Sequence, residues 1–234
     1  MSQTPHSESS REDARQDARI LESWHINALP WTRAVRDAQI ESRRLVTDRA
    51  IIETVLGCKP ATVLDIGCGE GWLARALARH GVRVTGIDAV PELIEQARRA
   101  GGGEFRVASY EQVARGAVRA EADVLVCNFA LLGKDPVDGL LRALPGLLRP
   151  GGILVIQTLH PLVACGELPY RDGWREGSWA GFDPAFTEPA PWYFRTLESW
   201  TRLLRWHGLR MRELIEPLHP VSQRPASIIF LAEL

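Results

Sequence analysis

The segment Val63–Gly71 joins an aliphatic run to an acidic residue and three glycines that alternate with other residues. A helix-like segment over 72–80 follows it directly. Strand, glycine turn and helix in this order build the ligand site of an open α/β sheet, at the carboxyl ends of its strands. Glycine tolerates the tight turn and lets a ligand approach the backbone closely. The segment therefore predicts an α/β fold with a nucleotide-type ligand at this turn.

The residues around this turn narrow the choice of ligand. The dinucleotide fingerprint G-x-G-x-x-G/A needs a small third residue for close helix–strand packing, and here that position is Trp72. Asp65 and Glu70 flank the loop, whereas a pyrophosphate favours neutral N–H groups at a helix N-terminus. The two carboxylates favour a ligand with a cationic amino-acid end. An NAD-dependent dehydrogenase is therefore the least favoured interpretation.

Three further motifs follow the glycine motif at 65–71. They are VTGID at 84–88, DVLVCN at 123–128 and LRPGGILV at 148–155. In this order and spacing, the four motifs resemble those of the class I S-adenosylmethionine-dependent methyltransferases. The resemblance runs from about Ile51 to the C-terminus. It implies an enzyme that uses S-adenosylmethionine as cofactor, releases S-adenosylhomocysteine, and methylates a small molecule.

The resemblance also implies roles for individual residues. Asp88 would accept both ribose hydroxyls, Gly67 and Gly69 would pass close to the methionine part, and Asp65 would act on its ammonium group. Two of these acids have alternative roles at this stage, because Asp65 could cap the following helix and Asp88 could be an N-cap before Pro91. The other positions expected at the cofactor are Arg43, Cys68, Ala89, Val90, Ser109, Tyr110 and Asn128.

Two of these positions carry specific expectations. Ser109 stands where the family often has an aspartate that binds the adenine amino group, and a serine hydroxyl still accepts one hydrogen bond. The backbone carbonyl of Asn128 or of Cys127 would face the ammonium group. Arg43 is the residue expected to pair with the cofactor carboxylate, since arginine binds carboxylates bidentately.

His160 is the catalytic residue that the sequence favours. It follows the fifth expected strand, whose end faces the ligand crevice, and histidine is suited to proton transfer at neutral pH. The alternative is that His160 holds a loop by hydrogen bonding without proton transfer. The residues expected to contact the substrate are His25, Trp31, Trp192 and Tyr193.

The rest of the chain predicts one domain. Residues 1–19 are polar and charged, which indicates a disordered or loosely helical tail. Residues 20–234 are expected to form a single methyltransferase domain, with 20–50 as an N-terminal cover. The aromatic-rich insertion 161–194 breaks the strand–helix alternation and is interpreted as a lid over the substrate, with a structural aromatic cluster as the alternative.

Alternating strands and helices define the expected fold class. The pattern predicts an α/β fold with parallel strands and right-handed crossovers. The resemblance implies a Rossmann-like, seven-stranded, mostly parallel sheet with helices on both faces and an antiparallel C-terminal strand. The expected strands are 61–66, 82–87, 104–107, 123–128, 152–158, 209–216 and 226–233. The expected core helices are 70–80, 91–100, 111–117, 136–148 and 196–207.

Composition limits the possible partners. The net charge of −1 over 234 residues gives no basic field for nucleic acid or a membrane surface. The four cysteines are scattered, so neither a metal site nor a disulfide framework is expected. No long apolar run or signal segment is present in the sequence, and a cytoplasmic enzyme is expected. The oligomeric state stays open.

The methyl acceptor also stays open at this stage. An oxygen atom of a small molecule is the favoured acceptor. Aromatic residues of the insertion suggest a planar or partly apolar substrate, whereas the arginines of the segment 33–44 suggest one with acidic groups. The alternatives are a nucleic-acid or protein methyltransferase and a protein that binds S-adenosylmethionine without catalysis.

Overall fold

The aliphatic runs form one central sheet. The computed structural model describes residues 5–234, and within them seven strands pair in the order β3-β2-β1-β4-β5-β9-β8. Strands β1 to β5 pair in parallel, and β9 runs antiparallel to its neighbours β5 and β8. The predicted fold class is confirmed. The strand bounds are β1 Thr62–Ile66, β2 Arg83–Asp88, β3 Glu104–Val107, β4 Ala122–Asn128, β5 Leu148–Thr158, β8 Arg210–Ile215 and β9 Ile228–Glu233.

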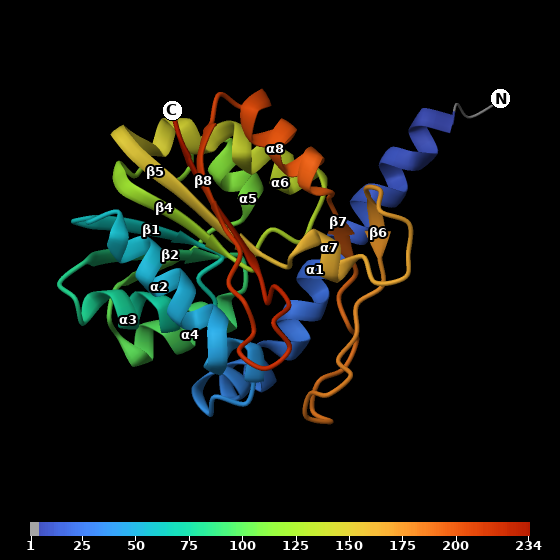
Figure 1. Ribbon diagram of the computed structural model, residues 1–234, viewed down its shortest axis with the longest axis horizontal. Coiled ribbons are helices and arrows are strands. Elements are labelled where there is room, and N and C mark those ends of the chain that lie inside the picture. The colour runs from blue at the N-terminus through green and yellow to red at the C-terminus, as the bar shows by residue number, and fades with distance from the viewer. Residues whose placement is uncertain (1–4) are drawn as a thin grey trace.

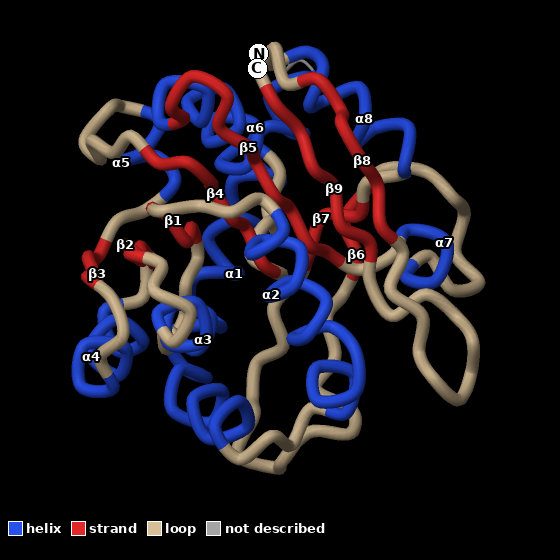
Figure 2. Tube along the Cα trace, turned by 60° about the vertical axis from the view of Figure 1, so that its left-hand side comes forward, coloured by secondary structure: helices blue, strands red, loops and turns tan. Residues whose placement is uncertain are grey.

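Helices cover both faces of this sheet (Figure 1). One face packs on α2 (Asp48–Gly57), α3 (Trp72–Ala78) and α4 (Pro91–Ala100). The other packs on α5 (Tyr110–Ala114), α6 (Asp135–Ala143) and α8 (Leu197–Trp206). Figure 2 shows the strands as a layer between α3 and α4 on one side and α5, α6 and α8 on the other. A 3₁₀ turn, η2 (Leu144–Leu147), leads from α6 into β5.

Strand β4 shows how the sequence specifies this layering. Its side chains alternate between the faces, with Val124 and Val126 in one core and Leu125 and Cys127 in the other. All four are buried. A strand that is covered on both faces reads as a continuous apolar run, as expected for a parallel sheet. This arrangement brings the carboxyl ends of β1, β2 and β4 to one edge of the sheet, where loops can form a site.

Helix α1 (Pro5–Arg36) favours the helical alternative over the disordered one for the tail expected at residues 1–19. Residues 5–19 form the first half of this helix, and residues 1–4 lie outside the described residues. Asp13 accepts a hydrogen bond from Trp174 Nε1 at 2.8 Å and pairs with Lys134 Nζ. Asp17 Oδ1 accepts from the Lys134 backbone N–H at 2.9 Å, where α6 begins. These tertiary contacts hold a polar segment in helical form.

The insertion after β5 packs beside α1 (Figure 1). It contains a short helix, α7 (Pro161–Ala164), and a separate two-stranded sheet of β6 (Gly173–Arg175) and β7 (Trp192–Phe194). A π-helix, η1 (Arg43–Thr47), joins the N-terminal region to α2. None of the helices in the described part of the chain has both the length and the apolar character to cross a membrane.

Candidate functional site

A cavity of about 1000 Å³ lies over the carboxyl ends of β1, β2 and β4. Its walls come from the glycine loop, the turn after β2, the start of α5 and the loop after β4. Helix α1, η1 and the insertion complete them. Of the residues expected at the cofactor, those that line the cavity are Arg43, Gly67, Cys68, Gly69, Asp88, Ala89, Val90, Ser109, Tyr110 and Asn128.

Glycines in the loop after β1 allow this loop to lie close to the loop after β4 and to α5. Gly67 has a φ of 75°, and a Cβ placed on it would lie 2.4 Å from Ala130 Cβ and 3.1 Å from the Tyr110 hydroxyl. Gly69 has a φ of 56° and lies opposite Trp31. A Cβ placed on Gly69 would be 3.8 Å from Nε1 of the Trp31 indole. Side chains at either position would be strained and would narrow the cavity.

Asp88 both shapes this loop and faces the cavity. Its Oδ2 accepts from the Gly69 backbone N–H at 2.9 Å, and its Oδ1 accepts from the Val90 backbone N–H at 2.9 Å. Burial raises the pKa of Asp88, against the lowering effect of these N–H donors. Val90, not Asp88, is the N-cap residue of α4, so Asp88 holds the turn between β2 and that helix.

Asp65 lies at the end of β1 and is 2 % exposed. Burial, followed by the charge of Asp88, raises its pKa to about 7. It is buried beneath the cavity and is not part of the cavity wall. The N-cap of α3 is Gly71 without any side-chain cap, so the alternative role of Asp65 as a helix cap is wrong. Asp65 instead places a buried, titratable carboxyl group under the glycine loop.

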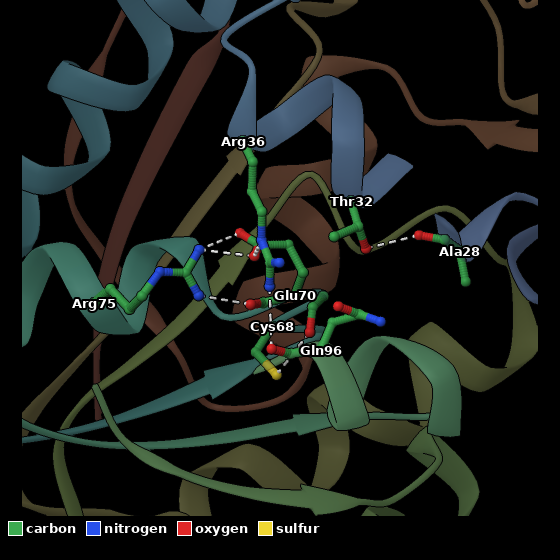
Figure 3. Close-up of polar contacts among 8 residues, drawn as sticks. Ala28, Thr32, Arg36, Cys68, Glu70, Arg75 and Gln96 are labelled. Carbon is green, nitrogen blue, oxygen red and sulfur yellow. Dashed lines mark hydrogen bonds and ion pairs between the residues drawn. The ribbon is translucent and has the colours of Figure 1, made fainter. Parts of the chain in front are cut away.

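Glu70 is not available to a ligand, which corrects the expectation that both acids of the loop act on it. Its carboxylate is fully buried and accepts from Arg75 Nη2 at 2.5 and 2.7 Å and from Arg36 Nε at 2.9 Å. Figure 3 shows Glu70 between these two guanidinium groups, and Arg36 also donates to the Gln96 backbone oxygen at 3.1 Å. Glu70 therefore ties α1 to the glycine loop.

Three buried polar atoms of the cavity wall have no hydrogen-bond partner among the described residues. They are Arg43 Nη2, Thr47 Oγ1 and Asn128 Oδ1. Arg43 is held by Asp48, which accepts from its Nε at 2.9 Å, and by stacking over Trp72 at 4.6 Å. Buried polar groups are nearly always paired in native structures, so unpaired ones in a cavity indicate a ligand. Thr47 was missed by the sequence interpretation, since no local motif marks it.

The chemistry of these three atoms fits the amino-acid end of S-adenosylmethionine. The guanidinium and the hydroxyl can donate to a carboxylate, and the amide oxygen of Asn128 can accept from an ammonium group. On the far side of the glycine loop, Ala89 and Val90 line the cavity beside Asp88. An acid there suits ribose hydroxyls, as in other nucleotide sites of open α/β sheets.

Ser109 and Tyr110 line the cavity at the start of α5. Ser109 is the N-cap of this helix, and its Oγ accepts from the Gln112 backbone N–H at 3.3 Å in a capping box. The Tyr110 hydroxyl donates to the Ala130 backbone oxygen at 3.0 Å, and burial raises its pKa well above the ordinary value. Tyr110 therefore joins α5 to the loop after β4 and fixes this end of the cavity.

His160 is placed away from the cavity, which argues against the predicted catalytic role. The cavity wall includes its neighbour Leu159, whereas His160 is buried and its Nε2 lies 2.7 Å from Glu216 Oε1. Glu216 follows β8, on the opposite side of β5 from β4. The histidine thus packs between β5 and the C-terminal segment, in keeping with the alternative structural role.

Only one of the four expected substrate contacts lines the cavity, namely Trp31. His25 is exposed on α1 with its Nδ1 3.1 Å from Glu92 Oε2. Trp192 and Tyr193 lie in β7, where the Tyr193 ring packs against Trp174 at 5.3 Å. Other aromatic residues also line the cavity, namely Trp24 of α1, Trp179 and Phe182 of the insertion, Trp72, Tyr110 and Phe129.

Hydrogen bonds join α1 to the insertion above the cavity. Asn27 Nδ2 donates to the Thr187 backbone oxygen at 2.7 Å, and Asn27 Oδ1 accepts from the Thr187 backbone N–H at 3.0 Å. Ser23 Oγ donates to the Glu188 backbone oxygen at 2.5 Å. We call the region formed by residues 14–31 of α1 and residues 178–188 of the insertion the roof. These contacts hold the roof together over the site.

Comparisons with known proteins identify the family of the chain. A family model described as a methyltransferase domain matches residues 41–214. A ubiquinone biosynthesis O-methyltransferase of Xanthomonas oryzae pv. oryzae is 38% identical over 105 residues, which cover 43% of this chain and 44% of that protein. One of Xylella fastidiosa is 38% identical over 109 residues, 44% of each chain. The chain thus spans less than half the length of these curated relatives.

Solved structures share the fold. An S-adenosylmethionine-dependent methyltransferase of Mesorhizobium loti superposes with a TM-score of 0.60 at 22% identity, covering 78% of this chain and 95% of that one. The 1,6-didemethyltoxoflavin-N1-methyltransferase of Burkholderia thailandensis, solved with S-adenosylhomocysteine, gives 0.59 at 21% identity, covering 99% and 91%. Because the family model spans well over half of the sequence, this chain belongs to the class I S-adenosylmethionine-dependent methyltransferases.

Proposed function

We propose that the protein transfers the methyl group of S-adenosylmethionine to an oxygen atom of a small molecule. The observation that carries this proposal is the set of unpaired atoms on Arg43, Thr47 and Asn128, together with Asp88, in a cavity of about 1000 Å³. A cavity at the upper end of the usual range for small-molecule sites has room for a cofactor and an acceptor. The name of the O-methyltransferase relatives supports oxygen as the acceptor atom.

In this proposal the residues of the chain bind and orient. Arg43 and Thr47 hold the carboxylate, Asn128 accepts from the ammonium group, and Asp88 accepts from the ribose hydroxyls. Ala89, Val90, Ser109 and Tyr110 surround the adenine. When bound, the cofactor would supply an activated methyl group for transfer to the acceptor oxygen, and the residues of this chain would hold the two in line.

The roof supplies the rest of the catalytic effect. By covering the cavity it would exclude water and hold the acceptor in line with the methyl group, which converts a bimolecular encounter into a positioned reaction. The described residues of the cavity wall include neither histidine nor lysine, so the groups of the wall that could take the proton of the acceptor are carboxylates, among them Asp17 and Asp135. A small-molecule acceptor suits an enclosed site better than a nucleic acid or a protein would.

Calorimetric titration with S-adenosylhomocysteine tests the cofactor half of this proposal. We expect a one-to-one complex, and a screen with a labelled methyl donor would then identify the acceptor. The same screen includes a nucleic acid and an unfolded protein mixture as acceptors. Absence of binding by the correctly folded protein would overturn the proposal, and labelling of only the macromolecules would overturn its small-molecule part.

A further inference from the structure

The acceptor side of the cavity is roofed by one face of α1. Ala14, Ala18, Leu21, Trp24 and Trp31 line the cavity, at spacings of three, four and seven residues that place them on one side of a helix. The cofactor residues Arg43, Asp88 and Asn128 belong to η1 and the sheet edge. Trp31, at the end of this α1 face, meets them, since its ring lies 5.7 Å from the Arg43 guanidinium and its Nε1 faces Gly69. The surface between α1, the loop after β4 and the insertion is therefore left for the acceptor.

Aromatic rings at right angles define this surface. Trp24 meets Trp31 with ring centroids 5.1 Å apart at 82°, and meets Trp179 at 6.1 Å and 81°. Trp179 meets Phe182 at 5.3 Å and 74°. All four line the cavity and are only partly buried, so part of each ring is uncovered. Perpendicular walls of this kind accept a flat ring, which can stack on one face and meet another edge-on.

Two aliphatic side chains in the same wall point to an apolar occupant. Leu21 is 39% exposed and Leu159 is 44% exposed, although both line the cavity. An uncharged hydrocarbon surface would cover them and gain the free energy of apolar burial. A strongly hydrated ligand would gain nothing from these contacts.

Charge on the acceptor side is negative. Besides Arg43 and Asp88, the charged residues of the cavity wall are Asp17, Glu111, Asp135 and Arg115. Glu111 and Arg115 lie at α5, beside the residues assigned to the adenine, whereas Asp17 of α1 and Asp135 of α6 lie on the acceptor side, where their two carboxylates disfavour an anion. Of the arginines that suggested an acidic substrate, Arg43 lines the cavity and is assigned to the cofactor carboxylate. Neither Arg33 nor Arg44 lines the cavity, and Arg36 is paired with Glu70. A cationic acceptor would be repelled by the sulfonium of the cofactor, so an uncharged acceptor remains.

We propose that the methyl acceptor is an uncharged, flat aromatic compound whose ring lies between Trp24, Trp179 and Phe182, and that Asp17 and its neighbouring carboxylates exclude carboxylated analogues. This inference rests on the proposed function and specifies its substrate class. Aromatic and apolar walls select the ring, and the acidic rim selects against negative charge. Phe182 and Trp179 are the residues that determine specificity for planar acceptors.

Three probes with one carbon skeleton test planarity and charge separately. They are 2-naphthol, which is flat and neutral, decahydro-2-naphthol, which is saturated and puckered, and 6-hydroxy-2-naphthoate, which is flat and anionic. Binding of each to the full chain saturated with S-adenosylhomocysteine is measured by calorimetry at pH 7. We expect 2-naphthol to bind about tenfold more tightly than the saturated alcohol, and about tenfold more tightly than the anion.

Matched variants assign these preferences to residues. Trp179→Leu and Phe182→Leu keep an apolar side chain but remove a ring, and we expect each to reduce the preference for 2-naphthol over decahydro-2-naphthol. Trp206→Leu is the control, because Trp206 is 82% exposed on α8 and outside the cavity. Asp17→Asn keeps an oxygen for the Lys134 N–H and should narrow the gap between 2-naphthol and the anion. The exposed Asp37→Asn, outside the cavity, should leave that gap unchanged.

The outcomes separate this inference from the proposed function. If S-adenosylhomocysteine binds but the anion or the saturated alcohol binds as tightly as 2-naphthol, the proposed substrate class is wrong while the cofactor assignment stands. The same conclusion follows if Trp179→Leu and Phe182→Leu leave the ring preference unchanged. If S-adenosylhomocysteine does not bind to folded protein, the proposed function itself fails.

Discussion

Asp65 and Asp88 lie at the carboxyl ends of neighbouring strands, and the charge of Asp88 adds to burial in raising the pKa of Asp65 to about 7. Two carboxylates so close in a desolvated setting cannot both ionise without cost. The site is therefore poised for a cation, whose positive charge would relieve both. S-adenosylmethionine carries a sulfonium and an ammonium group, which fits this electrostatic arrangement.

Asp65→Asn should change how stability depends on pH. Because folding raises the Asp65 pKa from 3.8 to about 7, between these values the native state holds a proton that the unfolded chain has lost. The free energy of unfolding therefore falls as pH rises through this window, by on the order of 4 kcal/mol. Asparagine removes this contribution, so the variant should lose less stability between pH 4 and pH 8. Urea unfolding at several pH values measures the free energy of unfolding of the wild type and the variant, with Asp37→Asn as control.

Asp88→Ala should weaken S-adenosylhomocysteine binding by roughly 1.5–3 kcal/mol, because a charged contact to the ribose is lost. Part of any loss of affinity would be indirect, because Asp88 also accepts hydrogen bonds from the Gly69 and Val90 backbone N–H groups and so shapes the loop. Asp88→Asn separates the two effects, since its amide oxygen can still accept one of these N–H groups. We expect intermediate affinity for this variant by calorimetry. Wild-type affinity in Asp88→Ala would contradict a ribose contact.

Arg43→Ala should weaken binding only of ligands with an amino-acid end. S-adenosylhomocysteine should lose roughly 1.5–3 kcal/mol, the range for a charged hydrogen bond. Its fragment 5′-methylthioadenosine, which lacks the carboxylate and the ammonium group, should bind the variant and the wild type equally. Arg44→Ala is the control, because Arg44 is exposed and does not line the cavity. Equal losses for both ligands would mean that Arg43 supports the cavity rather than the carboxylate.

The sheet and most of the cofactor residues were predictable because their signals are local. Aliphatic runs such as that of β4 and the turn around Gly67 mark strands and a ligand loop within a few residues. Thr47 has no such mark, since it reaches the cavity only through the π-helix η1. The sequence interpretation therefore named most of the residues that line the cavity at the sheet edge, but it omitted Thr47.

Where the structure departs from the favoured sequence interpretation, long-range contacts explain the difference. Residues 5–19 are helical because Asp13 and Asp17 find partners more than a hundred residues away. Glu70 is withdrawn from the ligand by Arg36, which precedes it by 34 residues. His160 faces Glu216 although its neighbour Leu159 faces the cavity. No pattern within a short window carries this information.

His160→Asn should leave methyl transfer nearly unchanged, because the side chain is outside the cavity. With an acceptor found in the screen, we expect kcat within about threefold of wild type, under 1 kcal/mol in the barrier. The pH profile of kcat should keep its shape. Loss of a general base would instead lower kcat by about 100-fold or more. The melting temperature should fall, since a buried contact with Glu216 is lost.

The double variant Ser23→Ala with Asn27→Ala should loosen the roof without touching the cofactor contacts. Asn27 both donates to and accepts from Thr187, and Ser23 donates to Glu188, so three hydrogen bonds worth about 1 kcal/mol each are removed. Hydrogen–deuterium exchange should therefore rise in residues 178–188 while the strands keep their protection.

Binding kinetics give the functional consequence of this loosening. A less securely held roof should release S-adenosylhomocysteine faster, with a smaller change in the association rate, as measured by stopped-flow tryptophan fluorescence. Glu22→Ala is the control, because Glu22 is exposed on the same helix and does not line the cavity. Unchanged exchange in the insertion, with an unchanged release rate, would show that the aromatic contacts between Trp24 and Trp179 hold the roof without these hydrogen bonds.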